Sequence, residues 1–233
     1  MSDSTGSETT RRGVRSFVLR GGRTTPAQRQ ALDSLWPRYG LRLGARDLLH
    51  RQLPTGAAIV LEIGIGNGDA LVDMASQEPD TEFVGVEVHR PGLGAALLKT
   101  QERDLENVRV IEGDACDVLR HHVATASLAG VRLFFPDPWP KKRHHKRRIV
   151  QPPFVQQVAQ ALRPGGVFHL ATDWAPYAEH MIEVLERCGK LENAVGPGQS
   201  APRPAWRTLT RFEKRGLNLG HEVTDLLYRR VDR

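Results

Sequence analysis

A short apolar run ends in a glycine-rich turn that could bind a ligand. Residues 60–68 place their three glycines as G-x-G-x-G, whereas dinucleotide sites use G-x-G-x-x-G. Glu62 comes just before these glycines. A carboxylate there repels a pyrophosphate but attracts a cation, and S-adenosylmethionine carries a sulfonium and an ammonium group. For the turn alone, the alternative is a tight strand-to-helix connection that binds nothing.

Two further acids follow the next two apolar runs. Glu87 ends the run 84–88, and an acid there can accept hydrogen bonds from both hydroxyls of a ribose. Asp114 follows the run 108–111 and could accept from an adenine amino group. The alternatives are an ordinary surface position for Glu87 and a helix N-cap role for Asp114, and the cap can coexist with ligand binding. Because the carboxyl ends of parallel strands share one crevice, the three acids predict a class I S-adenosylmethionine-dependent methyltransferase.

The fourth apolar run ends in Phe-Pro-Asp-Pro-Trp-Pro, residues 135–140. The prolines on both sides of Asp137 stiffen the backbone and remove amide donors, which would hold one carboxylate rigidly at the crevice mouth. Trp139 could stack on a base or cover the cofactor. A proline-rich turn around a core tryptophan is the alternative.

A strongly basic run, residues 141–148, follows that turn. Its position directly after the candidate catalytic turn favours contacts with phosphate, although charge runs are usually solvated surfaces. We expect no metal site here, because the two histidines lack other ligands.

Farther on, Asp173 follows the fifth apolar run and could accept from N1–H and N2–H of guanine, or it could cap the next helix.

The pattern around these residues alternates between strands and helices. The expected strands span residues 59–63, 83–88, 108–111, 131–135 and 167–171. Helical spacing of apolar residues separates them, and Thr25, Pro26 and Gln28 form a capping-box signature for an earlier helix. Two β-rich segments near 208–212 and 223–231 would form a C-terminal antiparallel hairpin. We therefore predict an α/β fold: a Rossmann-like, mostly parallel seven-stranded sheet with helices on both faces.

Composition and charge indicate the kind of partner and the cellular compartment of the protein. The charge of +6 from 33 Lys and Arg against 27 Asp and Glu suits a polyanionic partner. No apolar run is long enough to cross a membrane, and Cys116 and Cys188 suggest buried free thiols in a reducing cytoplasm. We predict a flexible basic tail over 1–23, a single domain over 24–233, and a monomer or homodimer.

Together these motifs identify the chain as a relative of the bacterial tRNA (guanine-N7)-methyltransferases of the TrmB type. The resemblance runs from about Thr25 to Val231, is most specific over 135–148, and includes Thr-Arg-Phe-Glu at 210–213. It implies transfer of a methyl group from S-adenosylmethionine to a guanosine in the tRNA variable loop, leaving S-adenosylhomocysteine.

The resemblance also implies a role for each matching residue. Asp137 would be the active-site acid and would also touch the cofactor. The other cofactor contacts would be Glu62, Gly64, Gly66, Gly68, Glu87, Asp114 and Ala115. The substrate nucleotide would be held by Lys141, Asp173, Thr210, Arg211, Phe212 and Glu213. The RNA contacts would be Arg143, His144, His145, Lys146, Arg147 and Arg148.

Three other functions remain open from the residues alone. A dinucleotide-dependent oxidoreductase conflicts with Glu62 and with the glycine spacing. A non-catalytic RNA-binding protein on the same scaffold conflicts with the complete set of acids. Methylation of another atom, or of DNA, is disfavoured because amino methyltransferases often carry Asn/Asp-Pro-Pro-Tyr where this chain has Asp137-Pro138-Trp139.

Overall fold

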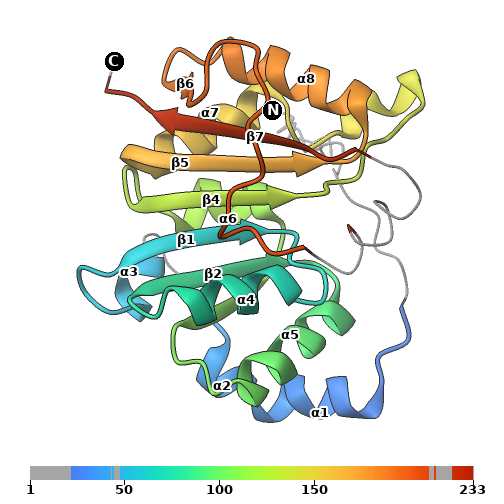
Figure 1. The fold of residues 1–233 in the computed structure, drawn as a ribbon. Coiled ribbons are helices and arrows are strands. Elements are labelled where there is room, and N and C mark those ends of the chain that lie inside the picture. The colour runs from blue at the N-terminus through green and yellow to red at the C-terminus, as the bar shows by residue number, and fades with distance from the viewer. Residues whose placement is uncertain (1–21, 43, 45–47, 210–212, 214–221, 233) are drawn as a thin grey trace, which may run out of the picture.

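A computed structural model describes residues 22–42, 44, 48–209, 213 and 222–232 of the chain. Its centre is a seven-stranded sheet with the order β3-β2-β1-β4-β5-β7-β6 (Figure 1). The strands are β1 (Ala58–Ile63), β2 (Thr81–Glu87), β3 (Val108–Glu112), β4 (Leu128–Phe134), β5 (Leu162–Thr172), β6 (Leu191–Asn193) and β7 (Thr224–Arg230). β1 to β5 are parallel, β7 is antiparallel to β5, and β6 is antiparallel to β7. The predicted fold class is thus confirmed.

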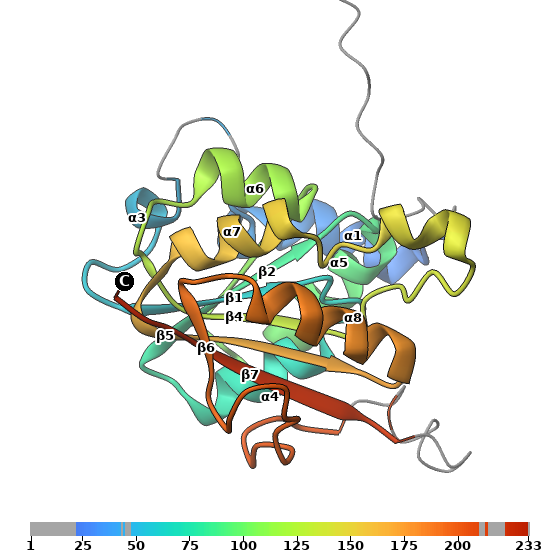
Figure 2. The same cartoon turned by 90° about the horizontal axis from the view of Figure 1, so that it is seen from above.

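Helices cover both faces of the sheet. The helices are α1 (Pro26–Ser34), α2 (Trp36–Tyr39), α3 (Leu48–Gln52), α4 (Asp69–Gln77), α5 (Arg90–Glu102), α6 (Ala115–His122), α7 (Pro152–Ala161) and α8 (Ala175–Glu186), with one 3-10 helix, η1 (Lys142–Arg147). Buried side chains of α1, α2, α4 and α5 form one core cluster, and those of α3, α6, α7 and α8 form another. Figure 2 shows α6 and α7 on one side of the central strands and α4 on the other.

Alternation along the strands separates these two cores. Val60 of β1 belongs to the core beneath α4 and α5, whereas Leu61 and Ile63 belong to the opposite core. Period-two alternation therefore places Glu62 on the same face as Val60. The same face carries Arg132 of β4 and His169 of β5, which are lateral neighbours of Glu62 in the strand register. A polar row thus crosses β1, β4 and β5 on one face of the sheet.

Several local predictions are confirmed, and two are not. Thr25 forms the capping box with Gln28 at the start of α1, and Asp114 caps α6 through the amide of Cys116. Among the described residues, however, β7 pairs with β5 and β6; of the predicted strand near 208–212, residues 208 and 209 are outside any strand and 210–212 lie outside the described residues. The two cysteines are half-buried and not fully buried.

The helices that the structure describes include none long and apolar enough to cross a membrane. The predicted basic tail lies almost wholly outside the described residues, which begin at residue 22. The predicted division of the chain at residues 23 and 24 therefore stays a prediction.

Candidate cofactor and substrate site

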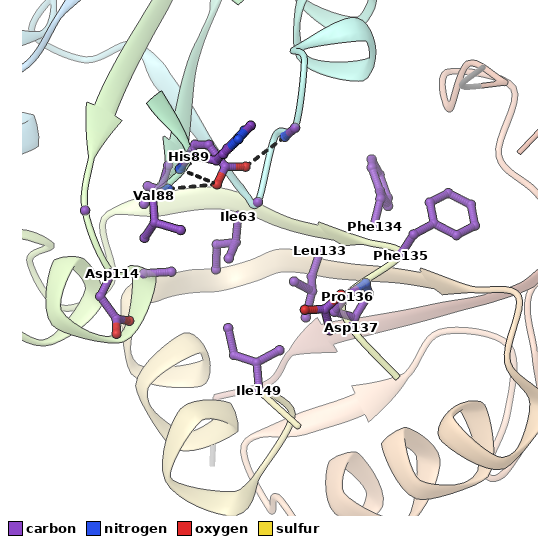
Figure 3. A pocket seen from close by; sticks show the side chains of 16 residues that line it. Ile63, Val88, His89, Asp114, Leu133, Phe134, Phe135, Pro136, Asp137 and Ile149 are labelled. Carbon is purple, nitrogen blue, oxygen red and sulfur yellow. Dashed lines mark hydrogen bonds between the residues drawn. The ribbon is translucent and has the colours of Figure 1, made fainter. Parts of the chain in front are cut away.

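A cavity of about 420 Å³ opens at the carboxyl ends of β1, β2, β3 and β4. It lies where the strand order reverses between β1 and β4, which is where open α/β sheets bind ligands. Figure 3 shows Asp114 on one side of this cavity and Asp137 on the other. The predicted cofactor residues that line it are Gly64, Gly66, Glu87, Asp114, Ala115 and Asp137.

The glycine turn forms an open wall of the cavity. Gly64 and Gly66 have φ of 73° and 54°, a region that L-residues with a Cβ rarely adopt. A Cβ at either position would meet no protein atom within 4 Å, so the backbone faces open space. Gly68 differs, because a Cβ there would lie 2.5 Å from Cβ of Ala96 in α5. Gly68 is required for helix packing and does not line the cavity.

Glu87 is held by the backbone around it. Its Oε2 accepts from the amide of Gly66 at 2.9 Å, and its Oε1 accepts from the amides of Val88 at 2.8 Å and His89 at 3.0 Å. These bonds tie the end of β2 to the glycine turn. They also fix the direction of a carboxylate that lines the cavity.

Asp114 combines both roles that the sequence left open. Its Oδ1 accepts from the amide of Cys116 at 2.9 Å, which caps α6, and the residue also lines the cavity. The helix cap holds the side chain at the end of β3. Ala115, the first residue of α6, lies beside it in the cavity wall.

Glu62 precedes Ile63 of the cavity wall in β1, but it is not itself among the residues that line the cavity and is only 3% exposed. Burial raises the pKa of its carboxyl to about 8; the cationic Arg132 opposes this rise, and the carboxylate of Glu87 adds to it. Among the described residues, Oε2 of Glu62 has no hydrogen-bond partner. A buried, unsatisfied carboxyl oxygen is costly in an apolar setting and is suited to a nearby cation.

The turn that carries Asp137 has a strained backbone, and a buried arginine stabilises it. Phe135 and Trp139, on either side of the Pro-Asp-Pro unit, have φ of 50° and 43°. Non-glycine residues in this region concentrate at functional sites, because the surrounding structure must impose the conformation. Nε of Arg148 donates to the carbonyl of Pro138 at 2.9 Å. Asp137 itself is exposed at the cavity wall.

The basic run forms η1, which the sequence did not predict. Lys141, Arg143 and Lys146 are exposed, and His144, His145 and Arg147 are half-buried. The guanidinium of Arg147 lies 4.1 Å from the centre of the Trp139 ring, so that Trp139 packs against η1. Arg148 is only 3% exposed, which places its guanidinium in the interior and argues against the predicted RNA contact of this residue.

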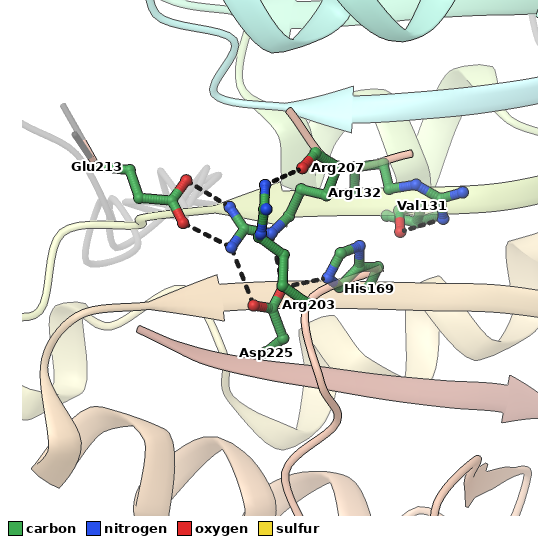
Figure 4. Close-up of polar contacts among 7 residues, drawn as sticks. All are labelled: Val131, Arg132, His169, Arg203, Arg207, Glu213 and Asp225. Atoms are coloured by element: carbon green, nitrogen blue, oxygen red, sulfur yellow. Dashed lines mark hydrogen bonds and ion pairs between the residues drawn. The ribbon is translucent and has the colours of Figure 1, made fainter. Parts of the chain in front are cut away.

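The predicted substrate residues are only partly described. Asp173 is half-buried after β5, and the N-cap position of α8 is occupied by Trp174 and not by Asp173. Thr210, Arg211 and Phe212 lie outside the described residues. Glu213 is 2% exposed, and Figure 4 shows its carboxylate facing Arg207.

Sequence reasoning missed the apolar part of the cavity and two buried arginines. Leu133 and Ile149 line the cavity, but as aliphatic residues they resemble ordinary core positions in the sequence. Arg132 sits inside an apolar strand and Arg207 in a loop rich in proline. The only available signal for Arg132 was a charge at a position where alternation requires a buried side chain.

The residues at this site fit S-adenosylmethionine. Three carboxylates, those of Glu87, Asp114 and Asp137, surround a partly apolar cavity beside an open glycine backbone. Glu62 adds a buried oxygen without a partner. This negative lining suits a cationic ligand with an apolar body better than it suits a pyrophosphate. The described residues include no group of three or more His, Cys, Asp or Glu that could hold a metal.

Solved structures with the same fold belong to one class of enzymes. The 16S rRNA methyltransferase KamB has a TM-score of 0.58 with 16% identity, covering 84% of this chain and 99% of that one. The antibiotic-resistance methyltransferase Kmr has a TM-score of 0.55 with 15% identity, covering 82% of this chain and 95% of that one. Fold and site therefore define a class I S-adenosylmethionine-dependent methyltransferase.

Comparison of sequences narrows this class to a family. Residues 56–226 match a family model described as a putative methyltransferase. A tRNA (guanine-N(7)-)-methyltransferase from Alkalilimnicola ehrlichii is 53% identical over 95% of this chain and 94% of its own length. One from Aeromonas hydrophila is 52% identical over 95% and 94%. The chain belongs to the tRNA (guanine-N(7)-)-methyltransferase family.

Proposed function

We infer that this protein transfers the methyl group of S-adenosylmethionine to N7 of a guanine in tRNA. The observation that carries this inference is the Asp137 turn: a carboxylate on a constrained backbone joins the cavity to a basic surface segment in a chain of this family. The target within tRNA that we propose is the variable-loop guanosine, as the family resemblance implies. We place the reaction in the cytoplasm, where unmodified tRNA is made.

The cofactor side of the site rests on four acids. We propose that Glu87 accepts from the ribose hydroxyls, since its carboxylate is already fixed by three amides at the end of β2. Asp114 would accept from the adenine amino group while it caps α6. Glu62 and Asp137 would face the cationic end. When bound, S-adenosylmethionine supplies an electrophilic methyl group on a positively charged sulfur.

The proposed methyl transfer to N7 does not require a proton-transfer step. Guanine N7 has a lone pair and no proton, so attack on the methyl carbon requires no general base. The purine gains positive charge as the bond forms, and a fixed carboxylate close to it lowers the energy of the transition state. We propose that Asp137 acts through position and charge, and that most of the rate enhancement comes from alignment of N7 with the methyl carbon.

The RNA side of the site rests on the exposed part of η1. Arg143 and Lys146 are exposed cations directly beyond the Asp137 turn, where they can meet phosphates. We propose Lys141, Asp173 and the segment 210–213 as contacts for the target nucleotide. Arg148 is better placed to hold the turn than to meet a phosphate, because its side chain is buried against Pro138 and Tyr177.

Substitution of the accepting atom tests this function. A tRNA transcript made with 7-deazaguanosine lacks N7 at every guanine but keeps the Watson–Crick edge. We expect methyl transfer to the normal transcript and none to the 7-deazaguanosine transcript, whereas a 7-deazaadenosine transcript should remain a substrate. Equal transfer to the two guanosine forms would contradict methylation at N7. A transcript with adenosine at the variable-loop position tests the proposed target.

A further inference from the structure

We propose that Arg207 is a positioning residue for the substrate side of this enzyme. Its guanidinium holds Glu213 against the carboxyl ends of β4 and β5, next to the Asp137 turn. The inference rests on the proposed function, because Glu213 belongs to the segment 210–213 that we expect to bind the target nucleotide. It assigns the placement of Glu213 to a residue six positions earlier in the chain.

Arg207 forms ion pairs with two carboxylates in the interior of the protein, and the pair with Glu213 is forked. It is 1% exposed, and its Nη1 and Nη2 each donate to one carboxylate oxygen of Glu213 at 2.7 Å (Figure 4). Its Nη2 also donates to Oδ2 of Asp225 at 2.9 Å, and its Nε lies 2.7 Å from Oδ1 of Asp225. One planar cation therefore bridges two carboxylates and pairs with that of Glu213 through two parallel N–H bonds, a fork that an ammonium group cannot form.

Asp225 anchors this bridge to the sheet. It lies in β7 opposite Ala171 of β5, one residue before the end of that strand. His169 of β5 contacts Oδ1 of Asp225 through Nε2 at 2.7 Å. Burial lowers the pKa of His169 to about 4, so the imidazole is neutral and Nε2–H donates to Asp225. The cluster thus contains one cation and two carboxylates, and the sheet side of it is fixed.

The same guanidinium also contacts the base of the Asp137 turn. Its carbon lies 5.9 Å from the ring centres of both Phe134 and Phe135. Phe135 has the positive φ that starts the strained turn, and its amide donates to the carbonyl of Ala171 at 2.8 Å. Arg207 therefore touches the ends of β4 and β7 and the residue Glu213 at once. Displacement of Glu213 would change the substrate side without disturbing the acids that surround the cofactor cavity.

Three variants distinguish a positioning role of Arg207 from a general effect on the stability of the protein. R207K keeps the charge but loses the fork, E213Q removes the charge of the held residue, and R230K is the control. Arg230 is a half-buried arginine of the same strand as Asp225, whose Nε donates to the carbonyl of Ala159 at 2.9 Å. Each variant is compared with the wild type for kcat and KM with tRNA, S-adenosylhomocysteine affinity and melting temperature.

We expect R207K and E213Q to lower kcat/KM for tRNA by about 100-fold, since a misplacement of about 1 Å can cost that much. S-adenosylhomocysteine affinity should stay within about threefold, and R230K should behave like the wild type. The double variant R207K/E213Q should be no worse than R207K, because the two residues act as one unit. Losses that multiply in the double variant would overturn the proposal, as would an equal loss of S-adenosylhomocysteine affinity.

A second measurement does not depend on methyl transfer. Trypsin sites at Lys214 and Arg215 follow Glu213 directly. We expect faster cleavage there in E213Q than in the wild type, with no change at sites elsewhere. Unchanged cleavage together with unchanged kcat/KM would overturn the proposal. A wild-type protein that binds S-adenosylhomocysteine but does not methylate tRNA would refute the proposed function, while cleavage would still report whether Arg207 holds Glu213.

Discussion

Nε of Arg148 donates to the carbonyl of Pro138 at 2.9 Å, one residue beyond Asp137. The Arg148 side chain is buried, and its guanidinium lies over the ring of Tyr177 at 4.8 Å. The last cation of a strongly basic run is therefore an internal support of the turn that carries Asp137, the active-site acid that we propose. The basic run thus contains one cation directed into the protein beside exposed cations directed outward.

Removal of this support should slow the reaction more than it weakens RNA binding. We expect R148A to lower kcat at least tenfold, because the Pro-Asp-Pro turn loses its anchor, with little change in KM for tRNA. The free energy of unfolding should fall by about 1–3 kcal/mol, since a buried hydrogen bond is lost. Single-turnover kinetics and urea denaturation measure the two effects. A raised KM with an unchanged kcat would instead place Arg148 in direct contact with RNA.

The outward-facing cations should show the opposite behaviour. We expect the double variant R143A/K146A to raise KM for tRNA and to reduce the salt dependence of tRNA binding by about two units of the log–log slope. S-adenosylhomocysteine binding should not change. R163A is the control, because Arg163 is exposed near the amino end of β5, away from the cavity. A salt slope equal to that of the wild type would remove Arg143 and Lys146 from the RNA surface.

Glu62 should make the stability of the ligand-free protein depend on pH. Burial raises the pKa of this carboxyl to about 8, against about 4.3 in an unfolded chain. The folded state thus binds the proton more tightly, and this contribution to stability is lost as pH rises toward 8. Below about pH 6.5 the lowered pKa of His169 acts in the opposite direction, because the unfolded state then gains a proton.

The cleanest range for this test is therefore pH 6.5 to 8. There, one proton contributes at most about 1.4 kcal/mol per pH unit, and we expect the wild type to lose about 1–2 kcal/mol. E62Q, which cannot ionise, should lose markedly less over the same range. Urea denaturation at the two pH values measures the difference. Parallel loss of stability in both proteins would mean that Glu62 is ionised in the folded state.

Two glycines of the same turn should differ in what their substitution affects. G64A forces alanine to a φ of 73°, at a cost of roughly 1–2 kcal/mol, and places a methyl group in the cavity wall. We expect reduced S-adenosylhomocysteine affinity in a folded protein. G68A has the same backbone strain and also a clash at 2.5 Å with Ala96, so it should be less stable than G64A. Calorimetry and thermal unfolding distinguish them, and equal stability would contradict the packing role of Gly68.

Much of the fold follows from local patterns. Five strands appear as short apolar runs, and the caps at Thr25 and Asp114 were recognisable because capping chemistry is local. The partner of β7 was not recognisable. β6 has three residues, too few for any alternation to stand out, and it reaches β7 across about 30 residues of chain.

The residues of the site likewise include some that the sequence could predict and some that it could not. Acids at strand ends were predictable, because parallel strands bring their carboxyl ends together. Arg148 and Arg207 were not distinguishable from surface cations, since burial of an arginine depends on distant partners: Pro138 and Tyr177 for one, Glu213 and Asp225 for the other. Tertiary contacts, and not residue type, decide which cations of a basic chain face solvent.

The most direct test of the account is methyl transfer by the wild type and by D137A, with the methylated nucleoside identified by mass spectrometry. We expect labelled methyl from S-adenosylmethionine to appear in 7-methylguanosine of tRNA. In D137A this product should fall by at least about 100-fold, although S-adenosylhomocysteine still binds. Label in any other nucleoside, or an equal yield from D137A, would contradict the account.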